Sequence, residues 1–269
     1  MTVSGTTTIA AVVAIAREKR ITVNAASLAF YAANTLVALV ILAYATFAVA
    51  GTGNVLARTL ELLTGVGATE FQRLFERMGG TAAGRRRAVG LAVVISVWSS
   101  LRLFGAVESA VTDVYGTRKE RSPLRTVVDA VLVLVAVTLI VGAMVVAGSL
   151  FLFRTAGGTG RLLGPVVLWL ALVVLFAPVY YGLSGSDVSV GEVVPGTVVA
   201  ATGWTVSAGA LRLYVTPSES VDLYGIVGAV LLVLTWLYVV GLSVLVGVVA
   251  NAYLAGRIEA DREWYPLGE

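Results

Sequence analysis

The chain has 269 residues, of which 58% are hydrophobic and only 13% are charged, and its mean hydropathy is +0.92. Soluble domains carry about 25% charged residues, so this composition predicts a protein that resides in a lipid bilayer. The chain contains no cysteine and no histidine. This excludes disulfides, thiolate or imidazole catalysis, and metal or haem sites built from those side chains, and we expect no cofactor and no bound metal.

The net charge of +3 does not indicate nucleic-acid binding. The basic residues stand in short clusters beside apolar runs, where such residues bind lipid phosphates or fix the orientation of membrane spans. We therefore expect membrane lipids as partners, and no nucleic acid. The sequence leaves the oligomeric state open.

Residues 1–20 predict an N-terminal segment that lies at the membrane interface. Apolar residues recur at helical spacing between Ile9 and Ala16, as in a short amphipathic helix. The basic residues at 17–20 follow this stretch, whereas a cleaved signal peptide places them before it. We expect the segment to stay attached.

Six apolar stretches follow, each long enough to cross about 30 Å of hydrocarbon. The fifth is rich in Gly, Ala, Ser and Thr, which allow helices to approach closely, so it is the best candidate for a buried span. The sequence predicts an all-α fold: a polytopic membrane helix bundle of about six transmembrane helices within residues 21–256, followed by a charged tail at 257–269. The stretches cover approximately Ala25–Ala50, Ala88–Ala110, Val127–Phe153, Leu162–Leu183, Gly196–Val215 and Leu223–Ala255.

Residues 51–87, between the first two spans, are too polar to cross a membrane. Apolar residues such as Leu56, Leu60 and Leu63 repeat there at helical spacing, while charged residues occupy the other faces. The pattern predicts interfacial amphipathic helices, which either cap the bundle or form a lid over a substrate path.

An even number of spans places both termini on one side of the membrane. The two sides carry nearly equal numbers of basic residues, but most of those on the far side lie in the long connection 51–87. The short loops therefore favour cytoplasmic termini.

Arg102 is the most informative single residue, because it falls inside the second span. A charge at the centre of a span costs roughly 2.5–3.5 kcal/mol on insertion scales, so we expect its side chain to face the bundle or a wet cavity. One interpretation is an anion-binding residue on a substrate path, with Ser99 one turn before it. The other is a structural pair or a side chain that reaches the interface.

Other polar residues add weaker candidates. Asn34 and Asn251 lie within spans and are possible substrate contacts, although such amides more often join helices. Tyr180 and Tyr181 are predicted at a membrane interface. The basic loop after the second span either binds anionic lipid headgroups or holds the topology. Its residues are Arg118, Lys119, Arg121 and Arg125.

Several segments together resemble the YihY/BrkB family of membrane proteins, formerly mislabelled ribonuclease BN. The similarity runs in the same order along nearly the whole chain. It includes Ala26–Ala32 in the first span, Trp98–Ser100 with Arg102 and Phe104 in the second, Val114–Gly116 after it, Val194–Gly196 with Ala200, Ala201 and Trp204 at the fifth, and Tyr224–Gly225, Gly228–Ala229, Trp236–Tyr238, Gly247 and Asn251–Ala252 in the last.

The resemblance implies a six-helix protein of the inner membrane, with both termini cytoplasmic and a link to the cell envelope. Family members often carry an acidic residue two positions before the final Asn, where this chain has Val249. A mechanism that needs this carboxylate, such as proton coupling, is therefore not expected here.

Three functions remain open at this point. The first is transport or translocation of a lipid-like or anionic envelope component. The second is a non-catalytic membrane scaffold or assembly partner. The third, which the old ribonuclease label suggests, is a membrane enzyme that would depend on carboxylates such as Glu108, Asp113 or Asp129, with Mg²⁺ as the metal that such residues could hold. We expect no enzymatic activity.

Overall fold

The computed structural model describes residues 5–49, 82–116, 160–184, 188–215 and 219–259, together with residues 57, 61, 68, 69, 72, 73, 128, 131, 135 and 139. The described ranges are helical and contain no strand, which confirms the all-α prediction. The helices are α1 (Gly5–Glu18), α2 (Ile21–Val49), α5 (Ala82–Tyr115), α7 (Gly160–Ser184), α8 (Val190–Val215) and α9 (Glu219–Leu254).

Five of these helices, α2, α5, α7, α8 and α9, are long and apolar enough to cross a bilayer. They match five of the predicted spans and confirm a polytopic helical membrane bundle. The predicted third span, Val127–Phe153, and the predicted amphipathic connection up to residue 81 lie outside the described residues apart from isolated positions.

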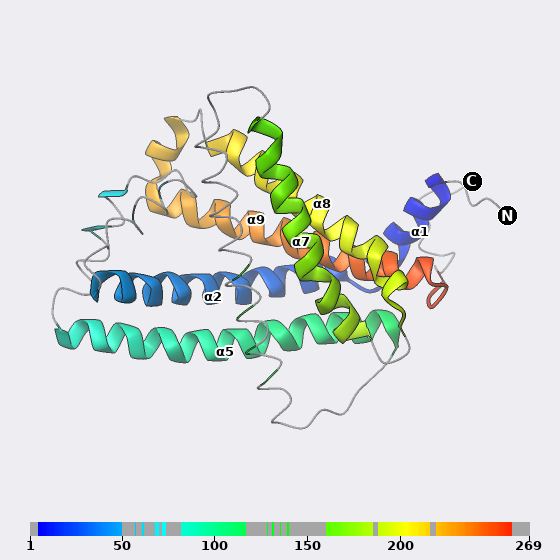
Figure 1. Cartoon of the computed structure of the whole chain (residues 1–269), viewed down its shortest axis with the longest axis horizontal. Helices are drawn as coiled ribbons and strands as arrows, with labels where there is room; N and C mark the ends of the chain where they lie inside the picture. The colour runs from blue at the N-terminus through cyan, green and yellow to red at the C-terminus, as the bar shows by residue number, and fades with distance from the viewer. Residues whose placement is uncertain are drawn as a thin grey trace.

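The helix α9 lies at the centre of the described bundle, between α2 and α8 (Figure 1). On the outer sides, α5 packs against α2 and α7 packs against α8. Figure 1 shows α2 and α8 running in one direction and α5 and α9 in the other, while α7 crosses them steeply.

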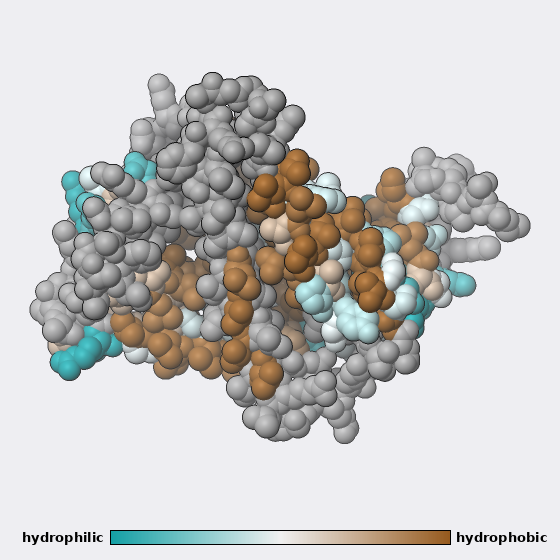
Figure 2. Space-filling view, viewed as in Figure 1, coloured by the Kyte–Doolittle hydropathy of each residue, from teal (hydrophilic) through white to brown (hydrophobic). Residues whose placement is uncertain are grey.

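The surface of the described helices suits a bilayer. Large apolar side chains are exposed along them, for example Val94 at 65% and Val174 at 71%. In Figure 2 the coloured apolar residues cover the middle of the molecule, and the strongly hydrophilic ones gather near its two ends. This distribution is expected where hydrocarbon surrounds the middle and water the ends.

The helix α1 packs against α9 and α2 at one end of the bundle. Its residues Ala11, Ala14 and Ile15 are fully buried, whereas Ile9 on another face is 67% exposed. A turn at Arg20, which has a positive φ of 48°, separates α1 from α2. The helix predicted within residues 1–20 is thus present, and its place at the membrane interface stays a prediction.

Helix boundaries differ from the predicted spans. The helix α5 begins before the basic residues at 85–87 and continues five residues beyond Ala110. It ends at Gly116, whose φ is +68° and whose N–H donates to the Thr112 carbonyl over 2.8 Å. This left-handed glycine is a common helix terminator, and hydropathy alone does not reveal it.

One prediction about burial is wrong. Among the described spans α9 is the most buried, with 39% of its apolar stretch inside the protein against 28% for α8. The small residues of α8 form one close contact face towards α9, while its other face is exposed. Tyr180 is only 2% exposed and donates a hydrogen bond to the Val244 carbonyl over 2.6 Å, so it packs inside the protein, whereas Tyr181 is exposed; the place of both residues at the membrane interface stays a prediction.

Candidate functional site

The outer face of α5 carries the exposed charge of Arg102. Its neighbours Leu103 and Phe104 are buried, whereas the Arg102 side chain itself is exposed. Within the described part of the chain we find no hydrogen bond or ion pair to its guanidinium. The side chain therefore does not point into the packed bundle, and its role in binding substrate stays a prediction.

Arg102 belongs to a stripe of exposed residues on α5 at helical spacing, which we call the α5 stripe. Towards the start of the helix the stripe is apolar, and from Arg102 towards the end it is small or polar. A Cβ added at Gly105 would meet nothing within 4 Å, so the surface beside Arg102 is open. The stripe consists of Leu91, Val94, Trp98, Arg102, Gly105, Ser109 and Asp113.

An adjoining face of α5 is joined to α2 by a buried hydroxyl pair. Ser99 and Thr35, both 0% exposed, share a hydrogen bond of 2.9 Å between their side-chain oxygens. Asn34, next to Thr35 in sequence, is half-buried and donates to the Phe30 carbonyl of its own helix over 2.9 Å. In this arrangement Ser99 connects two helices, although it lies one turn from Arg102.

Asn251 is fully buried, and it joins α9 to α8. Its Oδ1 accepts a hydrogen bond from the Gly196 N–H, while its Nδ2 has no partner in the described structure. The two helices touch here because Gly196 and Gly247 lack side chains: a Cβ at Gly196 would overlap the Gly247 carbonyl and the Asn251 amide. The geometry gives Asn251 a helix-joining role.

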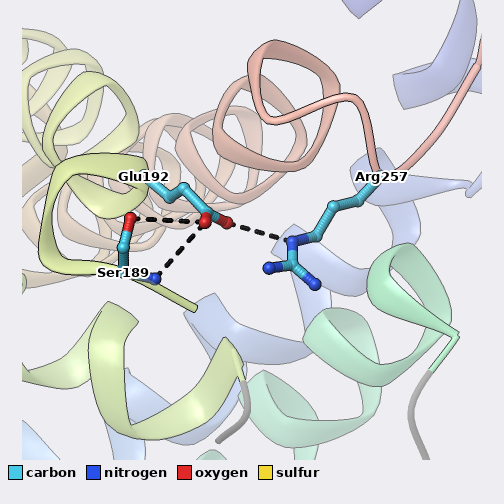
Figure 3. A network of polar contacts seen from close by, with 3 residues as sticks. All are labelled: Ser189, Glu192 and Arg257. Atoms are coloured by element: carbon cyan, nitrogen blue, oxygen red, sulfur yellow. Dashed lines mark hydrogen bonds and ion pairs between the residues drawn. The ribbon is translucent and has the colours of Figure 1, made fainter. Parts of the chain in front are cut away.

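An ion pair links the start of α8 to the chain just beyond α9 (Figure 3). Arg257 Nε lies 3.0 Å from Glu192 Oε2. The same carboxylate accepts weak hydrogen bonds from the backbone N–H and the hydroxyl of Ser189, at 3.4 Å and 3.3 Å. Ser189 and Glu192 thereby form a capping box, in which a residue of the first turn satisfies a free donor at the helix start.

The end of α9 is shaped so that Arg257 reaches this carboxylate. Gly256 has a φ of +67°, and its N–H donates to the Tyr253 carbonyl over 3.0 Å. The Arg257 N–H donates to the Ala252 carbonyl over 2.9 Å. These two bonds are those of a Schellman motif, which ends a helix and turns the following residue aside.

Of the four predicted site residues, Asn251 lies far from the other three, which are Arg102, Ser99 and Asn34. Gly241 of α9 contacts Ala25 of α2, so these two positions lie at the same level of the bundle. From that level Asn251 lies towards one end and Thr35, beside Ser99, towards the other. At 1.5 Å per residue the two are about 30 Å apart along the bundle axis.

Comparison with known proteins agrees with this membrane architecture. The family described as "Virulence factor BrkB" matches residues 12–266 of the chain. The chain belongs to the BrkB family. A curated relative, the "Putative ribonuclease-like protein YfkH" of Bacillus subtilis (strain 168), is 23% identical over 199 residues, covering 69% of this chain and 70% of the relative. No solved structure matches the chain.

BrkB proteins form a membrane protein family and not a known enzyme family, and the ribonuclease-like name belongs to a relative of low identity. Two of the three carboxylates that a nuclease reading would use lie within the described helix α5. Asp113 is exposed, Glu108 is half-buried, and Asp129 lies outside the described residues. Within the described ranges no three acidic side chains are grouped so that they could hold a metal ion.

The basic loop of this BrkB protein lies outside the described residues, so its proposed contact with lipid headgroups stays a prediction. The loop comprises Arg118, Lys119, Arg121 and Arg125.

Sequence reasoning missed three features of the BrkB chain: the Thr35 partner of Ser99, the inward Tyr180, and the pair between Glu192 and Arg257. Only Glu192 could have been found from the sequence, because Ser189 followed three residues later by Glu192 is the pattern of a capping box at a helix start.

Proposed function

We propose that this BrkB protein translocates a lipid-like or anionic component of the cell envelope, with the α5 stripe as the path of its polar headgroup. The proposal rests mainly on one observation: a guanidinium that is exposed near the middle of a helix long and apolar enough to cross a bilayer. Arg102 lies within the apolar stretch Arg86–Tyr115. At 1.5 Å per residue it is about 24 Å from Arg86 and about 20 Å from Tyr115, far from either end.

A charge in this position needs a compensating group. Its insertion costs roughly 2.5–3.5 kcal/mol even on the mildest scales. Hydrogen bonds to charged groups contribute about 1.5–3 kcal/mol, so a phosphate or carboxylate that meets Arg102 would offset most of the cost. An anionic headgroup is the ligand for which this energy balance is most favourable.

The rest of the stripe supports a path rather than a single fixed site. From Arg102 to the end of α5 the exposed positions Gly105, Ser109 and Asp113 are small or polar. An anionic headgroup that moves past Gly105 and Ser109 would find open space and a hydroxyl donor, whereas the carboxylate of Asp113 would repel it, so the path would leave the stripe before Asp113. The acyl chains of such a molecule would remain in the surrounding lipid.

We also propose that the protein resides in the inner membrane with both termini in the cytoplasm. Arg17, Lys19 and Arg20 precede α2, and Arg257 follows α9 at the same end of the bundle. Clustered basic residues favour the cytoplasmic side. Cysteines introduced near residues 19 and 257 of this cysteine-free chain are expected to react with an impermeant thiol reagent only after the cells are opened.

The transport proposal is tested with purified protein in phosphatidylcholine liposomes that contain phosphatidylglycerol with a fluorescent acyl chain. Dithionite added outside measures how fast the labelled lipid moves from the inner leaflet. We expect faster movement than in empty liposomes, and a loss of about tenfold or more in Arg102→Gln, which corresponds to about 1.4 kcal/mol. Arg86→Gln is the matched control, because Arg86 is also exposed on α5 but at the end of the span.

Movement no faster than in empty liposomes, or an Arg102→Gln variant as fast as the unmodified protein, would contradict the proposal. A protein that moves no lipid but co-purifies with a specific partner would instead favour the scaffold function.

A further inference from the structure

The helix α1 has an outer face that carries exposed apolar and basic side chains. Ile9 and Val13 are 67% and 37% exposed, and Arg17, one turn further along, is exposed as well. These three residues stand four apart, so they lie along one side of the helix. Ala14 and Ile15 lie on the other side and are fully buried. The helix therefore has one side for the protein and another that the described part of the chain leaves uncovered.

Two guanidinium groups at the end of this face are available to an anion. Arg17 and Arg20 are exposed, and neither side chain has an ion pair or hydrogen bond within the described residues. Lys19 lies between them in the sequence, but its charge is matched by Glu18, at 3.1 Å. The end of α1 thus presents two positive charges that the described residues do not neutralise.

The span of α2 places both arginines at the level of the lipid headgroups. Its apolar stretch begins at Ile21, directly after Arg20, and Arg17 stands about one helical turn earlier. At 1.5 Å per residue, Arg17 lies about 6 Å beyond the start of the stretch. The headgroup layer outside the hydrocarbon is about 5–8 Å thick on each side, so lipid phosphates surround this level.

The direction of α1 keeps its apolar side chains close to the bilayer. The positive φ at Arg20 interrupts the helical path, and Figure 1 shows α1 set at an angle to α2 instead of in line with it. The buried side of α1 packs against α9 and α2, which holds the helix against the end of the bundle. The lipid-facing surface of α2 also continues up to this point, since Val23 in its first turn is 62% exposed. Exposed apolar side chains in this place are stabilised by contact with lipid.

We propose that the outer face of α1, which consists of Ile9, Val13 and Arg17, binds anionic phospholipid at the membrane surface together with Arg20. The two guanidinium groups donate hydrogen bonds to phosphate oxygens, which arginine commonly binds in a bidentate manner. Ile9 and Val13 pack against the upper part of the acyl chains. This surface lies on a different helix from the α5 stripe, so the inference does not depend on the proposed function.

The test uses the full chain, which has no cysteine, with a single cysteine introduced at Val13 and labelled with the fluorophore bimane. The labelled protein is placed in liposomes of mixed phosphatidylglycerol and phosphatidylcholine. Two sets of liposomes have the same composition and differ only in which of the two lipids carries a nitroxide on its acyl chain. Because a nitroxide quenches bimane only at short range, the ratio of the two quenching strengths measures the preference of the surface for the anionic lipid. The same label at Ile9 gives an independent measurement.

We expect the nitroxide on phosphatidylglycerol to quench more strongly. Arg17→Gln and Arg20→Gln should each lower the preference about fivefold, which corresponds to the roughly 1 kcal/mol that a basic residue contributes near an anionic surface. Salt at 1 M should weaken the preference, because it shortens the Debye length to about 3 Å. Arg86→Gln is the matched control, since it removes an exposed arginine at the other end of the bundle, and it should change nothing. A label at Val174, which is 71% exposed on α7, should show no preference.

Equal quenching by the two nitroxide lipids, or a preference that survives both arginine substitutions, overturns the proposal. It is also overturned if iodide in the water quenches the label and the nitroxide lipids do not, because the outer face would then lie in water. A label that neither quencher reaches would show that protein covers the face, which contradicts the proposal as well. Circular dichroism identifies any variant that fails to fold, and the labelled protein with both arginines intact gives the lipid preference without the variants.

Discussion

Replacing Gly196 with alanine tests the close contact on which the joining of α8 and α9 depends. The new Cβ would overlap the Gly247 carbonyl and the Asn251 amide, so the helices have to move apart. Overpacking of this kind costs typically 1–3 kcal/mol. Separation also weakens the bond from the Gly196 N–H to Asn251, which adds about 0.5–1.5 kcal/mol.

Gly209→Ala is the matched control for this substitution. Gly209 lies in the same helix, and an added Cβ there would meet nothing within 4 Å. Both substitutions gain the same helix preference of alanine over glycine, roughly 0.5–1 kcal/mol, so this gain cancels in the comparison. Gly196→Ala is therefore expected to be less stable than Gly209→Ala by about 2–4 kcal/mol.

The assay is unfolding in mixed micelles with increasing dodecyl sulfate, followed by circular dichroism and by tryptophan fluorescence. Gly196→Ala is expected to unfold at a clearly lower detergent fraction, and Gly209→Ala at or above that of the unmodified protein. Equal midpoints for the two variants would refute the close contact between α8 and α9.

Three further substitutions test other contacts in the same unfolding assay. Thr35→Val removes the buried hydrogen bond to Ser99 and is expected to lower the free energy of unfolding by about 0.5–1.5 kcal/mol. Its control, Thr235→Val, removes only a hydrogen bond within an exposed turn of α9 and should change stability by less than about 0.5 kcal/mol. Equal effects would contradict a hydrogen bond between α2 and α5. Glu192→Gln is expected to lower stability at low salt, and the loss should vanish at high salt because the ion pair with Arg257 is partly exposed. A loss that does not depend on salt, or no loss at low salt, would argue against the ion pair. Arg20→Gly should stabilise the protein by about 1 kcal/mol, because glycine adopts a positive φ without strain. Arg17→Gly inside α1 should destabilise it by a similar amount. The opposite order would show that the backbone at residue 20 is not left-handed.

The sequence predicts where the membrane lies better than it predicts where helices end. All five described spans correspond to predicted apolar stretches, because about 20 apolar residues leave little alternative to a spanning helix. The helices nevertheless extend further, as α5 does on both sides of Ala88–Ala110. Backbone hydrogen bonds continue into water until a glycine such as Gly116 or a capping residue such as Ser189 stops them.

The direction in which side chains point is what the sequence does not reveal. The spans are apolar all round, so hydrophobic periodicity does not distinguish the face towards lipid from the face towards protein. The content of small residues therefore predicts α8 as the buried span, although the central helix is α9. For the same reason the sequence places Ser99, Asn251 and Arg102 in one candidate site. In the structure the side chains of Ser99 and Asn251 join helices, whereas that of Arg102 is exposed. Which predicted polar residues share a site depends on packing between distant segments.

The central claim is that an anionic headgroup comes to Arg102 at mid-membrane depth. Gly105 lies on the same stripe, and an added Cβ there would meet nothing within 4 Å, so the photoreactive amino acid benzoylphenylalanine is introduced at this position. In liposomes of mixed phosphatidylglycerol and phosphatidylcholine, mass spectrometry of the crosslinked lipid gives the enrichment of the anionic lipid over the bulk. We predict an enrichment of about tenfold that is lost in Arg102→Gln and kept in Arg86→Gln. Crosslinks that follow the bulk lipid composition, with or without Arg102, would contradict it.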